Sequence, residues 1–217
     1  EKLALIRKDR PMSLETWLSF ALASSILVLI PGPTVLLVIS YALGQGWRSA
    51  LPTAVGVALG DFTAMTLSML GLGAVLQTSA VLYLVLKWLG AGYLIWLGVK
   101  LWQAGGTLQV TPVLEKTHSR TMLFHAWLVT ALNPKSLTFF IAFLPQFMDQ
   151  AGDFWMQMLI FESTFLVLAF ANALFYALTA SRARTWVASE RVIKLFHRGG
   201  GALLAGAGLA VLWQSRS

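Results

Sequence analysis

The stretch VLIPGPTVLLV (residues 28–38) interrupts an apolar run of residues 17–43 with Pro31, Gly32 and Pro33. Proline has no backbone N–H and cannot continue the hydrogen-bond ladder of a helix. Inside a bilayer, each backbone group that loses its partner costs several kcal/mol unless protein or water meets it. The sequence therefore predicts a membrane helix that is broken at its centre, in a protein-lined or wet cavity.

The predicted break exposes two complementary sets of backbone groups. The carbonyls of Leu27 and Leu29 lose their helical donors and become free acceptors. The amides of Thr34 and Val35, at the start of the next half-helix, carry partial positive charge. A zwitterion has the matching ammonium and carboxylate. A packing kink is the alternative, since membrane helices tolerate proline, but a second break at Pro134 favours a binding site.

The composition is that of a membrane protein. Of the 217 residues, 57% are hydrophobic and 12% are charged, whereas about a quarter of an ordinary soluble domain is charged. The formal net charge of +7 does not predict nucleic-acid binding, because most basic residues lie in short connectors, where they set topology and face anionic lipid. The sequence has no cysteine, which excludes disulfides, thiolate metal sites and a cysteine nucleophile.

The predicted fold is all-α, with one transmembrane domain over residues 12–217 that crosses the membrane six times. Each crossing needs about 20 apolar residues, and the sixth is the weakest because its uncharged part covers only residues 199–213. Residues 1–11 are charged and precede a run too long for a signal peptide, so we interpret them as an N-terminal extension. The predicted spans are residues 15–43, 51–76, 81–102, 122–147, 154–178 and 194–213.

The two halves of the chain, residues 12–105 and 120–217, resemble each other. In each half a helix broken at proline precedes a helix with a central polar residue, Asp61 in the first and Glu162 or Asn172 in the second, and then a glycine-rich helix. Three crossings are an odd number, so the halves insert in opposite orientations, as in the inverted repeats of secondary transporters. Of the five connectors between the predicted spans, the first, third and fifth carry the Lys and Arg residues and the second and fourth carry none, which places the first, third and fifth in the cytoplasm.

Two charged residues lie near the centres of predicted spans. A charge such as Asp61 costs at least about 2.5–3.5 kcal/mol there, so it is protonated, paired or solvated. It is a candidate for neutralising a substrate ammonium or for carrying a proton, and a structural hydrogen bond is the alternative. Lys135 follows Pro134, and a cation at the N-terminus of a half-helix needs an anion nearby. Asp61, Glu162 and a substrate carboxylate are the candidates, and a pair that only holds the halves together is the alternative.

Other residues near these positions have narrower interpretations. Glu162 is a second candidate proton carrier, unless it faces the interface through water. Asn133 both donates and accepts hydrogen bonds, so it suits either ligand contact or satisfaction of the broken backbone. Gly56 and Gly60 form a GxxxG pattern, which is typical of close helix packing.

Four motifs in this order and spacing resemble those of the LysE/RhtB family of amino-acid exporters. They are PGP at residues 31–33, GVALGD at 56–61, KWLGAGYLIWLGVKLW at 87–102 and NPKSLTFFIAFLPQF at 133–147. The resemblance covers residues 12–147 and implies a multi-pass protein of the bacterial inner membrane that exports amino acids, driven by the proton motive force. The residues at the family's motif positions, which we expect to form the substrate site, are Pro31, Gly32, Pro33, Asp61, Asn133, Pro134 and Lys135.

We therefore expect a proton-coupled exporter whose substrate site lies near the bilayer midplane, between two inverted repeats. The substrate carboxylate faces the amides near Thr34 and Lys135. The ammonium faces Asp61 and the carbonyls that proline frees. Asp61 or Glu162 exchanges the coupling proton as the two halves rock around the site.

The sequence leaves the substrate class open. No second acidic residue is close in sequence to Asp61, which favours a neutral amino acid of the threonine, homoserine or leucine type over a basic one. An ion or small-solute channel is a further alternative. An intramembrane enzyme is not expected, because the sequence has no HExxH and no cysteine. Amino acid, protons and lipid are the expected partners, small-residue helix faces permit a homodimer, and no metal or cofactor is expected.

Overall fold

The computed structural model describes residues 12–78, 112–113, 115–149 and 152–182, with the backbone alone for 72–78, and a set of isolated positions. Those positions are residues 81, 85, 88–89, 92, 95–96, 99, 102–103, 198, 202, 205–206 and 209.

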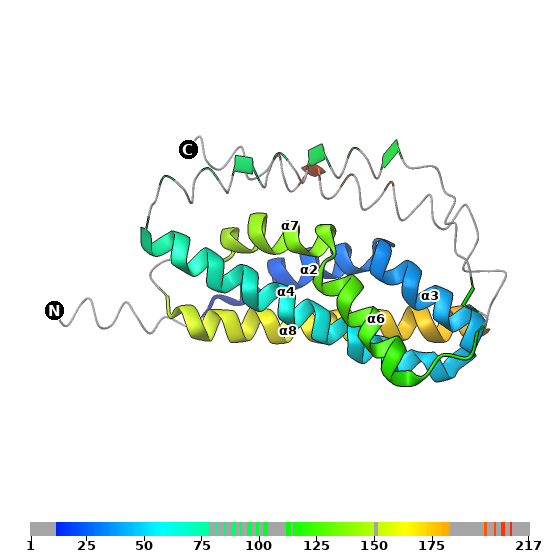
Figure 1. Ribbon diagram of the computed structural model, residues 1–217. Coiled ribbons are helices and arrows are strands. Elements are labelled where there is room, and N and C mark those ends of the chain that lie inside the picture. The colour runs from blue at the N-terminus through cyan, green and yellow to red at the C-terminus, as the bar shows by residue number, and fades with distance from the viewer. Residues whose placement is uncertain are drawn as a thin grey trace.

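Throughout the continuous described ranges, the regular elements are helices, which agrees with the predicted all-α class (Figure 1). Their order is α2 (Leu14–Leu29), α3 (Pro33–Gln45), the 3-10 helix η1 (Gly46–Ser49), α4 (Ala50–Thr78), α6 (Ser119–Ala131), α7 (Pro134–Ala142), the 3-10 helix η2 (Leu144–Gln146) and α8 (Phe154–Arg182).

Both predicted helix breaks are present. α2 ends at Leu29 and α3 begins at Pro33, while α6 ends at Ala131 and α7 begins at Pro134. Proline is favoured at this first helical position, because its fixed φ suits the helix and its missing N–H has no intrahelical acceptor there. The segment Pro134–Gln146 is bent by 45° from α6. Each break therefore ends one half-helix and starts another, and at the second break the new half-helix takes a new direction.

Gly46 turns the chain between α3 and α4. Its φ of 71° is in the region that glycine enters without steric cost. η1 follows, and α4 then runs back along the bundle (Figure 1). The apolar stretch Pro33–Gly71 has 39 residues, about twice the length of one crossing, and this turn divides it.

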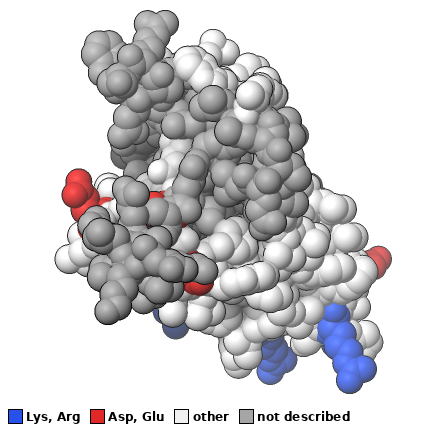
Figure 2. Space-filling view, turned by 90° about the vertical axis from the view of Figure 1, so that its left-hand side faces the viewer, with Lys and Arg blue, Asp and Glu red and all other residues white. Residues whose placement is uncertain are grey.

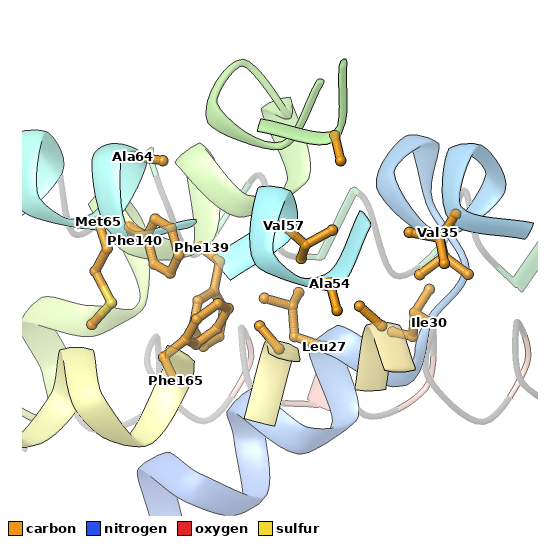
Figure 3. Close-up of a cluster of buried hydrophobic side chains, with 14 of the residues drawn as sticks. Leu27, Ile30, Val35, Ala54, Val57, Ala64, Met65, Phe139, Phe140 and Phe165 are labelled. Carbon is orange, nitrogen blue, oxygen red and sulfur yellow. The ribbon is translucent and has the colours of Figure 1, made fainter. Parts of the chain in front are cut away.

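The two 29-residue helices, α4 and α8, form the centre of the described bundle. α4 contacts α6, α7 and α8, while α2 and α3 pack on α8. Aromatic side chains fill the space between them. Phe140 lies 4.8 Å from Phe165 and Phe20 lies 4.6 Å from Phe161, measured between ring centroids. Figure 3 shows Phe139, Phe140 and Phe165 beside Met65 in this core.

The GxxxG pattern brings α4 against α6, as predicted. A Cβ added at Gly56 would lie 2.4 Å from the carbonyl oxygen of Leu123. A Cβ added at Gly60 would lie 2.6 Å from the Cβ of Thr130. Because these distances are shorter than real contacts, the backbones approach as closely as they do only with glycine at both positions.

We expect Gly60→Ala to destabilise the protein and Gly71→Ala to leave its stability unchanged or slightly higher. Alanine is the better helix former by about 1 kcal/mol at both positions. At Gly60 a clash that costs about 1–3 kcal/mol opposes this gain, whereas no described atom lies within 4 Å of a Cβ at Gly71. Thermal unfolding of the purified variants in detergent measures the difference, and equal shifts would show that the α4–α6 contact does not require glycine.

The outward faces of the helices suit a lipid environment. On α8, the side chains of Leu159, Val167 and Phe175 are all more than half exposed, as expected for a helix that meets hydrocarbon rather than water. The described part of the face in Figure 2 is largely uncharged, with Lys and Arg side chains projecting at its lower edge.

The described residues support two or three membrane-crossing segments. By length and composition alone, Pro33–Gly71, which the turn at Gly46 divides, and Phe154–Arg182 are long and apolar enough, and the bent pair Ser119–Ala131 with Pro134–Gln146 makes a third if it forms one span. α2 is a shorter apolar helix. Most of the predicted spans 81–102 and 194–213, and the extension 1–11, lie outside the described residues. The six-span count and the inverted repeat therefore stay predictions.

Candidate functional site

The two helix breaks face each other across a small cavity. Its walls come from α2, α3, α4, α7 and α8. Two of its apolar lining residues, Leu27 and Val57, belong to the buried hydrophobic cluster drawn in Figure 3. The volume of about 30 Å³ equals the share of one water molecule in the liquid. The polar residues that line the cavity are Thr34, Asp61, Asn133, Lys135, Ser136, Asn172 and Tyr176.

The carbonyls at the end of α2 receive hydrogen bonds from the second half of the chain. Lys135 Nζ donates to the carbonyl oxygens of Leu27, at 3.0 Å, and Ile30, at 2.8 Å. The two carbonyls between them have neutral donors, since Asn172 Nδ2 bonds to Val28 O at 2.8 Å and Tyr176 OH bonds to Leu29 O at 2.8 Å. The break is thus satisfied by side chains, as burial of backbone groups requires.

Lys135 finds its counter-charge in another helix. We predicted that this cation needs an anion, because it follows the N-terminus of its own half-helix. The structure places its ammonium at the C-terminus of α2, which is the negative end of that helix dipole. Asp61 also attracts the ammonium electrostatically. Lys135 of α7 is therefore bonded directly to the end of α2, with Asp61 of α4 lining the same cavity.

Asn133 joins the two breaks directly. Its Oδ1 accepts from the backbone N–H of Lys135 at 3.0 Å and caps α7. Its Nδ2 donates to Thr34 Oγ1 at 3.0 Å, and Thr130 Oγ1 donates to the same oxygen at 3.2 Å. Asn133 thus satisfies the broken backbone, one of its two predicted roles, with Thr34 as its partner in the other half.

The start of α3 leaves amides that face no acceptor in their own helix. The first N–H groups of any helix lack intrahelical partners, Pro33 has none, and the Leu36 N–H already bonds to Gly32 O at 2.9 Å. The amides of Thr34 and Val35 remain, and both residues line the cavity. They form the positive end of a helix dipole beside the cavity.

Asp61 is buried with an unused hydrogen-bond acceptor. Only 4% of the residue is exposed, and Ser136 lies beside its carboxyl group and interacts with it. Asp61 Oδ1 has no hydrogen-bond partner among the described residues, and neither has Asn172 Oδ1. Two acceptors without donors therefore line the same cavity, which suits a ligand that brings N–H groups.

Glu162 has a different environment. It is 7% exposed and its Oε1 accepts a hydrogen bond from Thr66 Oγ1 at 2.5 Å, between α8 and α4. It is not among the described residues that line the cavity. The structure therefore brings Asp61, Lys135, Asn133 and Thr34 together and leaves Glu162 apart.

Three polar residues that line the cavity are not predicted as site residues from the sequence: Ser136, Asn172 and Tyr176. Ser136 follows Lys135 directly. The sequence predicts Asn172 as an alternative central polar residue of its span and assigns no role to Tyr176. The two are four residues apart on α8 and so share one helix face. A search for polar residues at this spacing in the fifth predicted span finds both.

No group of His, Asp and Glu residues suited to a metal ion occurs in the described part of the chain. The polar groups that line the described cavity are suited to recognising charge and hydrogen-bond donors.

Comparison with known proteins gives one family. A family model described as LysE type translocator matches residues 25–215. The chain is 34% identical over 202 residues to a homoserine/homoserine lactone efflux protein of Salmonella typhimurium, which covers 92% of this chain and 98% of the relative. It is 32% identical over 154 residues to a leucine efflux protein of Enterobacter sp., covering 70% and 73%.

A third relative, an uncharacterized membrane protein of Vibrio cholerae, is 29% identical over 198 residues, which is 91% of this chain and 97% of the relative. No solved structure matches the chain.

Proposed function

We propose that this chain, which belongs to the LysE type translocator family, exports a neutral amino acid from the bacterial cytoplasm across the inner membrane. The observation that carries the proposal is the unpartnered Asp61 Oδ1, buried beside the Lys135 ammonium in the cavity between two broken helices. The efflux proteins to which the chain is similar are named for homoserine and leucine, both neutral amino acids.

The cavity offers a partner to each end of an amino-acid zwitterion. The amides of Thr34 and Val35 are suited to the carboxylate, because they are the positive end of the α3 dipole. Asp61 Oδ1 and Asn172 Oδ1 are suited to the ammonium, because each is an acceptor without a donor. Pro31, Gly32, Pro33 and Pro134 contribute by keeping both breaks open.

The charge of the cavity favours a neutral substrate. Among the lining residues that the structure describes, Asp61 is the one acidic side chain and Lys135 the one basic side chain. A zwitterion adds no net charge to this pair, whereas lysine or arginine adds an uncompensated positive charge in a region of low dielectric. Basic amino acids are therefore the second candidate.

The structure corresponds to a closed form of the proposed carrier. A cavity of about 30 Å³ holds about one water molecule, which is less than any amino acid needs. Binding requires α2 and α3 to separate from α7 and α8. Alternation between such closed and open forms, with one half moving against the other, is how secondary transporters operate.

Asp61 is the proposed carrier of the coupling proton. It lies in the cavity, so that proton binding and ammonium binding compete for one carboxyl group. Glu162 is the second candidate, and its bond to Thr66 puts it outside the cavity, where it would act without touching the substrate.

Export from cells loaded with dipeptides tests the function. Cells with and without the protein are loaded with dipeptides of leucine, homoserine, threonine or lysine, and release of the free amino acid is measured with and without a protonophore. We expect faster release of a neutral amino acid that saturates and collapses with the proton gradient. Release of lysine alone would favour the basic alternative, and non-saturating release would favour a channel. No difference for any amino acid would refute the proposal.

A further inference from the structure

We propose that Lys135 is a tethered substitute for the substrate ammonium. In the empty protein its Nζ occupies the cation site at the end of α2, and a bound amino acid displaces it. The identity of the displacing ligand rests on the proposed function, whereas the cation site rests on the geometry alone.

The end of α2 has the properties of a cation site. Two carbonyl oxygens, those of Leu27 and Ile30, converge on one ammonium at 3.0 Å and 2.8 Å. Leu27 belongs to the last turn of α2 and Ile30 is the residue that caps it, so both oxygens lie at the negative end of the helix dipole. The neighbouring carbonyls of Val28 and Leu29 bond instead to neutral side chains. The positive charge is thus held at one particular pair of oxygens.

This cation site lies where the ammonium of a substrate would bind. Leu27, Lys135 and Asp61 line one cavity, and the Asp61 carboxyl attracts the Lys135 ammonium. A second ammonium in the same cavity would face one carboxylate together with Lys135, and two cations a few ångströms apart repel strongly at low dielectric. The cavity volume of about 30 Å³ also leaves no room for both. Entry of an amino acid therefore requires Lys135 to leave the carbonyls.

A second position is available to the Lys135 ammonium when a substrate displaces it. Its side chain passes next to Gly32, where an added Cβ would lie 3.5 Å from both Cε and Nζ. Gly32 caps the N-terminus of α3, whose amides are the proposed carboxylate site. A displaced Lys135 is thus within reach of the carboxylate of the ligand that displaced it. The exchange keeps every charge in the cavity paired, with and without substrate.

The substitute role explains how the empty protein closes. Without an internal cation, Ile30 O would lose its described donor, Leu27 O would keep only the backbone N–H of Ile30 at 3.2 Å, and Asp61 would be a buried charge without a counter-charge, which is costly at low dielectric. With Lys135 in place, these carbonyls of the empty site have a donor and Asp61 has a counter-charge. The protein can therefore return to its starting conformation without a bound substrate.

The cation site is tested by chemical rescue. Lys135→Ala removes Cγ, Cδ, Cε and Nζ, which n-propylammonium restores atom for atom. We expect n-propylammonium to raise the melting temperature of purified Lys135→Ala in a saturable way by about 3 °C or more, with no effect on the wild type. The uncharged isostere 1-propanol is the control ligand. Tyr176→Phe is the control variant, because it removes a neutral donor to Leu29 O and creates no ammonium-sized space.

Competition tests whether this is the substrate's site. With n-propylammonium at ten times its own dissociation constant, the dissociation constant of the exported amino acid for Lys135→Ala is expected to rise about elevenfold, as mass action requires for a shared site. Rescue without competition would make Lys135 a structural cap and overturn the inference while leaving the exporter intact. Absence of rescue would refute the cation site itself. Failure of the wild type to export any amino acid would instead refute the proposed function, and this inference with it.

Discussion

Asp61→Asn is expected to abolish proton-coupled export while the protein still folds and inserts. Asparagine keeps the shape of the side chain but has no negative charge and cannot exchange a proton. The Lys135 ammonium and the substrate ammonium then lack their common counter-charge. Removing one partner of a buried charge pair costs about 2–5 kcal/mol or more, so we expect a loss on the order of 100-fold in the export rate. Export from dipeptide-loaded cells measures the loss of transport. The amount of protein in the membrane fraction measures whether the variant still folds and inserts.

Glu162→Gln is the matched control for this loss. Like Asp61, Glu162 is a buried carboxyl group on a long helix, and its change to the amide is of the same size. It bonds to Thr66 rather than lining the cavity, so we expect substrate affinity to be unchanged in this variant. If Asp61→Asn exports normally and Glu162→Gln does not, the coupling carboxyl is Glu162 and Asp61 has only a structural role.

The helix breaks could be predicted because their cause is local. Proline removes an N–H whatever surrounds it, so the ends of α2 and α6 follow from Pro31 and Pro134 alone. The partners of the freed carbonyls are not local. Tyr176 bonds to Leu29 O across 147 positions of sequence, and only the packing of α8 on α2 brings the two together. The sequence therefore located the break but not the groups that satisfy it.

The positions of the charged residues show the same limit. From the sequence, Glu162 and Asn172 are alternatives for the central polar residue of the fifth predicted span. They are ten residues apart, which rotates them by about 80° around the helix and separates them by about 15 Å along it, so only Asn172 reaches the cavity. For Lys135, the dipole of its own helix predicted an anion, while the structure provides the carbonyls of α2. Which helix end lies opposite depends on the tertiary fold.

Closing the first break is expected to remove substrate binding. Ile30 and Gly32 flank Pro31 in extended conformation, with ψ of 118° and −171°. In the triple variant Pro31→Ala/Gly32→Ala/Pro33→Ala, all three replaced residues become good helix formers, and α2 can continue into α3. The carbonyls at the end of α2 would then accept hydrogen bonds from backbone N–H groups, and the N–H of Thr34 would donate a hydrogen bond within the continuous helix. We expect amino-acid affinity to fall on the order of 100-fold, as for the loss of two charge-assisted hydrogen bonds.

Pro52→Ala is the control for the break. Pro52 lies in the first turn of α4, where proline interrupts nothing, so its replacement should leave affinity unchanged. Far-UV circular dichroism of the purified variants reports whether helix content rises in the triple variant, and equilibrium binding of the exported amino acid reports whether the site is intact. A rise in helix content with unchanged affinity would mean that the break between α2 and α3 is a packing kink. The substrate would then bind elsewhere, because a continuous helix has neither the free amides nor the free carbonyls that a zwitterion needs.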